Sequence, residues 1–188
     1  MARPKEFDKG EALDAAIGVF CEHGYAGTSA TMLTSAMKIG RQSLYDTFVD
    51  KWQLYCAALR RYGEGETQAH ITALRTGPKA IDGIYRMMGR VVRTAHTPCL
   101  GVGSISEFGD KQDELNAIRA ELGMPLSAAL IATIAQAQAD GDAQNDADPK
   151  LLAAFLLASI AALRISARGG AGPDELESLG QLALRALR

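Results

Sequence analysis

Apolar side chains recur at helical spacing in the first fifty residues, and the segments between breaks are short enough to favour a compact set of small helices. Leu13, Ala16, Ile17 and Phe20 follow the i, i+3, i+4, i+7 pattern of an amphipathic helix. We expect this helix to start near residue 8. It should end at Gly24, because glycine suits the left-handed conformation that often closes a helix.

Two further short helices follow within thirty residues. Thr28 and Ser29 are typical N-cap residues for the second helix, and a break at residues 38–40 separates it from a third helix that turns Leu44 and Phe48 inward. A lysine in this break requires a helical or a mildly strained left-handed conformation. A helix, a short helix, a tight turn and another short helix together predict a helix-turn-helix motif.

The rest of the chain is also predicted to be helical. Asp50 and Gln53 resemble a capping box that opens a fourth helix, and 19 of the 78 residues from position 111 onward are alanine. We expect helices over about 78–92, over 111–139 with an interruption or kink at 123–125, and over 151–163. The fold class is therefore all-α, with a helix-turn-helix domain over residues 1–50 and a helical bundle over residues 51–188.

The third helix should present a polar face opposite its apolar edge. Gln42 can pair with adenine, Ser43 can hydrogen-bond to either strand, and the Tyr45 hydroxyl can reach a phosphate. Arg41 can read guanine or bind a phosphate, and Lys51 at the start of the fourth helix can contact a phosphate. These side chains suit the major groove of DNA.

Charge alone does not indicate nucleic acid. Residues 1–51 contain six Lys or Arg against seven Asp or Glu, and the whole chain has a net charge of -2. Asp46 can accept a hydrogen bond from cytosine, or it can be a solvated or locally bonded carboxylate. Arg3 and Lys5 can form a minor-groove arm or belong to a frayed terminus.

Residues 8–59 resemble the DNA-binding domain of TetR-type (TetR/AcrR) transcriptional regulators. The resemblance is carried by Phe20-x-x-x-Gly24, by Thr28-Ser29, by the segment from Ile39 to Phe48, and above all by Leu44-Tyr45-x-x-Phe48-x-x-Lys51. The sequence departs from the family pattern at the turn, where Lys38 replaces the usual glycine, and at the cap of the third helix, where Gly40 replaces Ser or Thr.

The resemblance implies a dimeric regulator, usually a repressor, that binds operator DNA and is released by a small molecule. The positions that match the DNA-contacting residues of the family are Ser29, Thr31, Gln42, Ser43, Tyr45, Thr47 and Lys51. With Arg41, they form the predicted DNA-binding set.

The resemblance also implies an effector cavity among the C-terminal helices. Candidate lining residues combine apolar walls with a few polar groups: Tyr62, Tyr85, Met88, His96, Cys99, Ser104, Phe108 and Phe155. An apolar or aromatic effector suits these residues, and a thiol-reactive signal at Cys99 is the alternative. Core packing is the competing interpretation for most of them.

The helix over residues 151–163 is apolar on every side, and a small domain seldom covers such a helix with its own chain. We expect a two-fold four-helix interface here, as in the family. The predicted interface residues are Leu126, Leu130, Ile134, Leu152, Phe155, Leu156 and Leu163.

No catalytic, metal or cofactor site is predicted. The histidines His23, His70 and His96 are scattered, and the three cysteines form no C-x-x-C motif. The longest apolar stretch is shorter than the roughly 18–20 residues of a membrane span, and the N-terminus lacks the apolar core of a signal peptide. We therefore expect a cytoplasmic protein without a transmembrane helix.

A second class of function remains open. The acidic balance slightly favours a helical small-molecule-binding protein or enzyme that keeps the fold without binding an operator. General DNA packaging is disfavoured by the pI of about 5.9.

Overall fold

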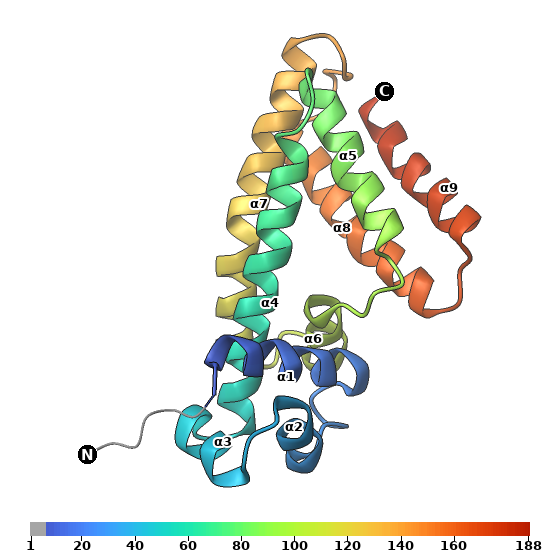
Figure 1. The fold of residues 1–188 in the computed structure, drawn as a ribbon. Helices are drawn as coiled ribbons and strands as arrows, with labels where there is room; N and C mark the ends of the chain where they lie inside the picture. The colour runs from blue at the N-terminus through green and yellow to red at the C-terminus, as the bar shows by residue number, and fades with distance from the viewer. Residues whose placement is uncertain (1–6) are drawn as a thin grey trace. The chain divides into compact units, whose positions relative to one another are not determined.

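The computed structural model describes residues 7–188, and every regular element in that range is helical (Figure 1). In chain order the helices are α1 (Lys9–His23), α2 (Ala30–Met37), α3 (Arg41–Phe48), α4 (Lys51–Leu74), α5 (Ala80–Arg93), α6 (Leu100–Phe108), α7 (Asp113–Ala139), α8 (Pro149–Arg168) and α9 (Pro173–Leu184), followed by the 3₁₀ helix η1 (Arg185–Leu187). The all-α prediction is confirmed. Arg3 and Lys5, for which the sequence leaves open a minor-groove arm or a frayed terminus, lie outside the described residues.

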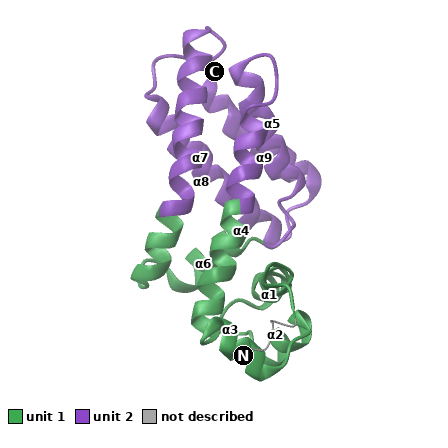
Figure 2. Cartoon of the chain, turned by 60° about the vertical axis from the view of Figure 1, so that its left-hand side comes forward, with its two compact units in different colours: residues 1–64, 99–120 green, residues 65–98, 121–188 purple. Residues whose placement is uncertain are grey.

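The chain forms two compact units (Figure 2). Unit 1 comprises residues 1–64 and 99–120, and unit 2 comprises residues 65–98 and 121–188. The division differs from the predicted boundary at residues 50 and 51. The first half of α4 belongs to unit 1 because its side chains pack there; the ring of Tyr55, for example, meets Phe20 of α1 edge to face, with centroids 5.0 Å apart.

The ends of the first two helices are set by local capping. The Asp8 side chain accepts a hydrogen bond from the Glu11 amide at 2.8 Å, and the Ser29 hydroxyl accepts one from the Met32 amide at 3.2 Å. α1 ends at Gly24, whose φ of 68° requires glycine-like freedom and whose amide donates to the Phe20 carbonyl. The predicted start and stop of α1 are thereby confirmed, as is the Ser29 cap.

The turn between α2 and α3 is left-handed at Lys38, with φ 55° and ψ 39°. Of the two conformations predicted for this lysine, the left-handed one is adopted. For a residue other than glycine this conformation costs on the order of 1 kcal/mol. The Lys38 side chain is exposed.

An aromatic cluster forms the centre of unit 1. Phe108 at the end of α6 packs against Tyr25, Trp52 and Tyr55, with ring centroids 5.6, 5.6 and 5.7 Å away. Burial raises the pKa of Tyr55 to about 12. The cluster joins the loop after α1, the first half of α4 and α6, which lie far apart in the sequence.

Unit 2 is held by an aliphatic core. α5 supplies four residues that are completely buried, and α7 and α8 add further ones: Ile84, Met87, Met88, Val91, Leu130, Ile134 and Leu156. α9 packs on α5 and α8. The sequence analysis did not predict α9, although its approach to α5 is close enough that a Cβ at Gly180 would lie 2.6 Å from a methyl group of Val92.

α7 is a single helix from Asp113 to Ala139 with Pro125 inside it. Of the two alternatives expected at residues 123–125, the interruption is therefore wrong, and the kink stays a prediction. Proline removes the hydrogen bond from its own nitrogen to the carbonyl of residue 121, and both residues lie at the surface, where water can bind that carbonyl. The remaining bonds continue the helix.

By length and composition alone, α7 and α8 are apolar enough to cross a membrane. Core helices of soluble proteins pass the same test, and both helices place side chains such as Leu130 and Leu156 in the core of unit 2. The expectation that no segment spans a membrane stays a prediction.

Candidate functional site

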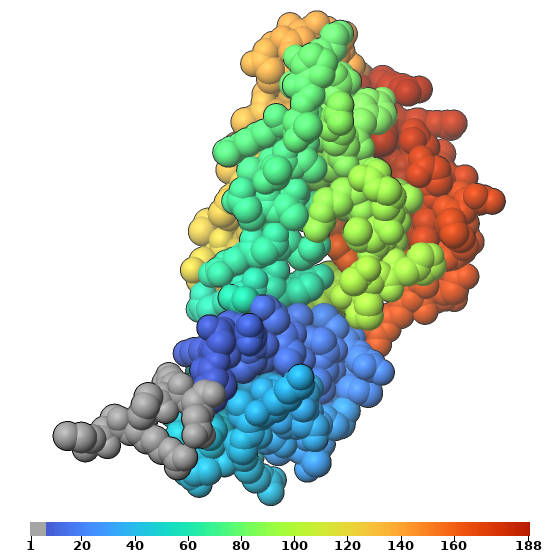
Figure 3. All heavy atoms as spheres, viewed as in Figure 1, coloured from blue at the N-terminus to red at the C-terminus, as the bar shows by residue number. Residues whose placement is uncertain are grey.

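The recognition helix α3 has one buried edge and one exposed face. Leu44 and Phe48 are only 1% and 3% exposed, as the sequence predicted. The opposite side carries exposed Arg41, Gln42 and Tyr45. Ser43 and Thr47 are half-buried. In Figure 3 the atoms of α2 and α3 form part of the open surface of unit 1. This placement suits a helix that enters a groove of DNA.

Local hydrogen bonds already engage two side chains of the predicted DNA-binding set, Gln42 on α3 and Ser29 at the start of α2. The Gln42 side-chain amide donates to the Asp46 carboxylate at 2.8 Å, one helical turn away. This supports the interpretation of Asp46 as a locally bonded carboxylate. The bond uses one of the two N–H donors of the Gln42 amide. From α2, Thr31 is exposed, whereas the Ser29 hydroxyl already accepts the capping bond.

Lys51 has a role that the sequence did not indicate. Its Nζ donates to the carbonyls of Tyr25 and Thr28, both at 2.8 Å, and lies 4.2 Å from the centre of the Tyr25 ring. These carbonyls belong to the turn between α1 and α2. The phosphate contact predicted for Lys51 stays a prediction, and the ammonium already holds two backbone groups of unit 1.

Glu107 of α6 binds the amides of the same turn. Its two carboxylate oxygens accept from the Tyr25 amide at 2.8 Å and the Ala26 amide at 2.7 Å. We call the contacts of Lys51 and Glu107 with residues 25–28 the turn clamp. Sequence reasoning missed Glu107 because the partners are separated by 81 and 82 residues and no local pattern links them.

The predicted effector residues are divided between the two units. Tyr62, Cys99, Ser104 and Phe108 belong to unit 1, whereas Tyr85, Met88, His96 and Phe155 belong to unit 2. Three of them have surroundings that the structure describes. Phe108 packs in the aromatic cluster, Met88 is buried in the core of unit 2, and His96 is exposed. The effector set stays a prediction.

A charged cluster that the sequence did not predict lies inside unit 2. The Glu66 carboxylate of α4 accepts from Arg90 of α5 at 2.7 and 3.3 Å and from Arg164 of α8 at 2.9 Å. Arg164 also donates to the Thr97 carbonyl at 3.3 Å. Burial raises the pKa of the Glu66 carboxyl, but the two guanidinium groups outweigh this effect and hold the pKa below its usual range.

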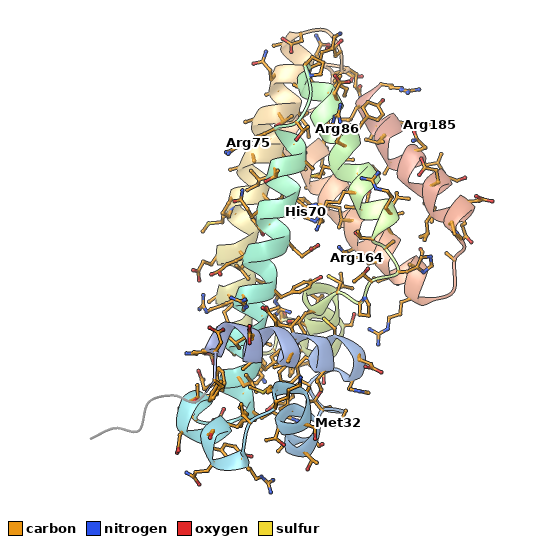
Figure 4. The ribbon with its side chains drawn as sticks, viewed as in Figure 1. Met32, His70, Arg75, Arg86, Arg164 and Arg185 are labelled. Atoms are coloured by element: carbon orange, nitrogen blue, oxygen red, sulfur yellow. The ribbon has the colours of Figure 1, made fainter. Side chains whose placement is uncertain are left out.

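His70 completes this cluster, one turn beyond Glu66 on α4. Its Nε2 lies 3.5 Å from a guanidinium nitrogen of Arg90 and 3.8 Å from the Glu66 carboxylate, while its buried Nδ1 has no hydrogen-bond partner among the described residues. Burial, assisted by the Arg90 charge, lowers the pKa of His70 to about 4, so that the ring is neutral at pH 7. Figure 4 shows His70 and Arg164 directed into the interior of unit 2. We call Glu66, His70, Arg90 and Arg164 the charged cluster.

Most of the predicted interface residues face the core of their own protomer. Leu126, Leu130, Ile134, Leu152, Leu156 and Leu163 are each at most 8% exposed. A side chain covered by its own chain has no surface left for a partner, so these six residues do not fit the predicted role. The error arose because the helix is apolar on all sides, which conceals the side that faces its own core.

Phe155, the seventh residue, is 48% exposed and belongs to an apolar stripe along α8. The stripe consists of Leu151, Ala154, Phe155, Ala158, Ala162 and Ile165, which are all exposed. Their spacing keeps them on one face of the helix. Exposed Met124, Ala128, Ala132 and Ala135 give α7 a similar apolar surface.

Comparison with known proteins agrees with this architecture. Residues 12–58 match the family described as bacterial regulatory proteins, tetR family. The chain is 31% identical over 193 residues to the uncharacterized HTH-type transcriptional regulator YezE of Bacillus subtilis (strain 168), covering 100% of both chains. It is 31% identical over 190 residues to the HTH-type transcriptional repressor ComR of Escherichia coli (strain K12), covering 97% of this chain and 90% of ComR.

A similar solved structure is that of a cysteine variant of the TetR family transcriptional regulator CifR, complexed with 26bp double-strand operator DNA. It has a TM-score of 0.84 and 29% sequence identity, and the match covers 99% of this chain and 100% of CifR. The chain belongs to the TetR family of transcriptional regulators.

Lys51→Met should lower the free energy of unfolding by roughly 1–3 kcal/mol, because the carbonyls of Tyr25 and Thr28 lose their charged donor while the aliphatic stem is kept. Urea denaturation followed by circular dichroism measures the change. Lys111→Met is the matched control, since Lys111 is exposed. Equal denaturation midpoints for the two variants would contradict the clamp role of Lys51.

His70 should make stability depend on pH. Its folded-state pKa of about 4 lies below the ordinary value of 6.5, so between these values the unfolded chain binds a proton that the folded chain does not. The contribution is present above about pH 6.5 and is lost as the pH falls toward 4. The unfolding free energy of His70→Leu, measured from pH 7 to pH 4, should therefore fall less steeply than that of the wild type. The variant His96→Leu, at an exposed histidine outside the charged cluster, is the control for the substitution itself.

Proposed function

We propose that this chain is a homodimeric transcriptional repressor that binds operator DNA through α2 and α3 and is released when a small molecule binds to unit 2. The observation that carries the DNA-binding role is the exposed polar face of α3, held in place by buried Leu44 and Phe48. The likeness to CifR bound to operator DNA supports it. Names of relatives as regulator and repressor agree with a non-enzymatic role.

The proposed DNA contacts fall into two groups, those to base edges and those to phosphates. Gln42 and Ser43 read base edges, and Arg41 reads guanine or binds a phosphate. Tyr45 and Lys51 contact phosphates, which set the register without reading sequence. Ser29, Thr31 and Thr47 complete the contact surface from α2 and the end of α3.

Dimerisation is proposed through the apolar stripe of α8, together with the exposed apolar side of α7. Large exposed side chains such as Leu151, Phe155 and Ile165 are 67%, 48% and 57% exposed in the protomer, and a continuous apolar stripe of this kind favours burial against a partner. A two-fold axis would place the same stripe of a second copy opposite it. The two DNA-binding units of such a dimer would match a palindromic operator. We also propose that the protein is located in the cytoplasm.

The combined Ser43→Ala and Tyr45→Ala substitution should weaken binding to operator DNA at least about tenfold and leave the melting temperature nearly unchanged. Both side chains lie away from the buried edge of α3. Gel shifts with DNA flanking the protein's own coding region, compared with a scrambled duplex, measure the loss. Ser178→Ala on the exposed surface of α9 is the control. Wild-type protein that does not distinguish the two duplexes would instead favour a small-molecule-binding protein without an operator.

Phe155→Glu should convert the dimer to a monomer, because two-fold symmetry would place two carboxylates in the apolar interface. Sedimentation velocity at micromolar concentration measures the change. Leu182→Glu is the matched control, since Leu182 is 53% exposed on α9 and lies outside the stripe. A monomeric wild type, or a dimeric Phe155→Glu variant, would rule out the α8 interface.

A further inference from the structure

The charged cluster contains more positive than negative charge. Arg90 and Arg164 contribute two cations, Glu66 contributes one anion, and His70 is neutral at pH 7. Arg164 is only 6% exposed, and its bonds to Glu66 and the Thr97 carbonyl use fewer N–H donors than a guanidinium carries. A buried charge without full compensation is unfavourable. The cluster therefore lacks one negative charge.

The cluster also lacks a hydrogen-bond acceptor. Nε2 of His70 faces an N–H donor of Arg90, so in the neutral ring Nε2 accepts and Nδ1 carries the hydrogen. His70 is only 5% exposed, and its Nδ1 has no partner among the described residues. Buried polar atoms in folded proteins are nearly always hydrogen-bonded. An acceptor beside His70 would satisfy this donor.

One chemical group would remedy both deficits. A carboxylate carries a single negative charge, which brings the net charge of the cluster to zero, and its two oxygens match the fork of a guanidinium. A phosphate with two negative charges would overcompensate. The Glu66 and Arg90 side chains are 27% and 23% exposed, so the cluster can be reached from solvent while Arg164 and His70 form its buried part.

We propose that unit 2 binds a small molecule through a carboxylate group held by Arg164 and Arg90, with His70 donating from Nδ1. The assignment of this molecule as the effector rests on the proposed function. It also replaces the expected apolar or aromatic effector with an anionic one.

Calorimetric titration of the purified full chain tests the binding site without DNA. The probes are hexanoate and benzoate, with hexanamide as the neutral analogue and hexyl phosphate as the other anion. We expect at least one carboxylate to bind, at least tenfold more tightly than hexanamide and hexyl phosphate. Binding of neither carboxylate would mean that water or a simple ion satisfies the cluster, and preference for the amide or the phosphate would equally overturn the proposal.

Arg164→Lys and His70→Gln separate a ligand contact from a merely structural role. Each keeps a polar group in place, and each should weaken carboxylate binding at least tenfold if the chain remains folded by circular dichroism. Arg168→Lys, one turn further along α8 and exposed, is the matched control and should bind as the wild type does. Should Arg164→Lys not fold, His70→Gln decides. Unchanged affinity in the folded variants would overturn the proposal.

Gel shifts with operator DNA then test the role of the ligand. Saturating carboxylate should weaken operator binding of the wild type at least fivefold and leave Arg164→Lys unaffected. Failure of the unliganded protein to bind operator would reject the proposed function and leave the calorimetric result standing. Operator binding that is insensitive to a bound carboxylate would overturn the effector assignment alone.

Discussion

The backbone of residues 25–28 joins α1 to α2, and its polar groups have to find partners outside regular helix. Two charged side chains provide them: Lys51 donates to the carbonyls of Tyr25 and Thr28, and Glu107 accepts from the amides of Tyr25 and Ala26. Bonds between charged side chains and backbone groups are about twice as strong as neutral ones. The turn is thus tied to α4 and to α6 at once.

The turn clamp also contributes to the position of the recognition helix α3. Helix α3 is positioned by the apolar contacts of Leu44 and Phe48 and by α2, which itself begins just after the clamped turn. The aromatic cluster of Tyr25, Trp52, Tyr55 and Phe108 lies on the same elements, since Tyr25 belongs to the turn and Phe108 to the helix that carries Glu107. A displacement of α6 within unit 1 would therefore be felt at the turn that leads into α2.

Unit 2 combines an aliphatic core with a charged cluster, and the two have different sensitivities. The core is closely packed, whereas the charged cluster has unequal charge and its His70 Nδ1 has no hydrogen-bond partner among the described residues. A ligand of the right charge changes the energy of the cluster more than that of the apolar walls. The carboxylate that we propose for this unit would accordingly be recognised by charge first and by shape second.

Much of the local structure could be predicted because its causes lie within a few residues. The inward side of α3, the Ser29 cap and the end of α1 at Gly24 follow from helical periodicity and from side-chain groups three or four positions away. The exposed polar face of α3 follows from the same periodicity. α9 was not predicted, since tertiary packing outweighs weak local signals. The continuity of α7 past Pro125 was not predicted either, because the remaining backbone bonds outweigh the loss of one at a surface proline.

The sequence by itself determined the all-α class, the helix-turn-helix and the residues that α3 exposes, because each depends on short-range geometry along one helix. Tertiary structure alone decided which side of α8 is covered, so that Leu156 is buried and Phe155 is exposed. It also decided that Lys51 and Glu107 meet one turn, and that Glu66 and His70 meet Arg90 and Arg164. Such pairs depend on how the helices pack, and the order of charged residues along the sequence does not predict which distant charges will meet.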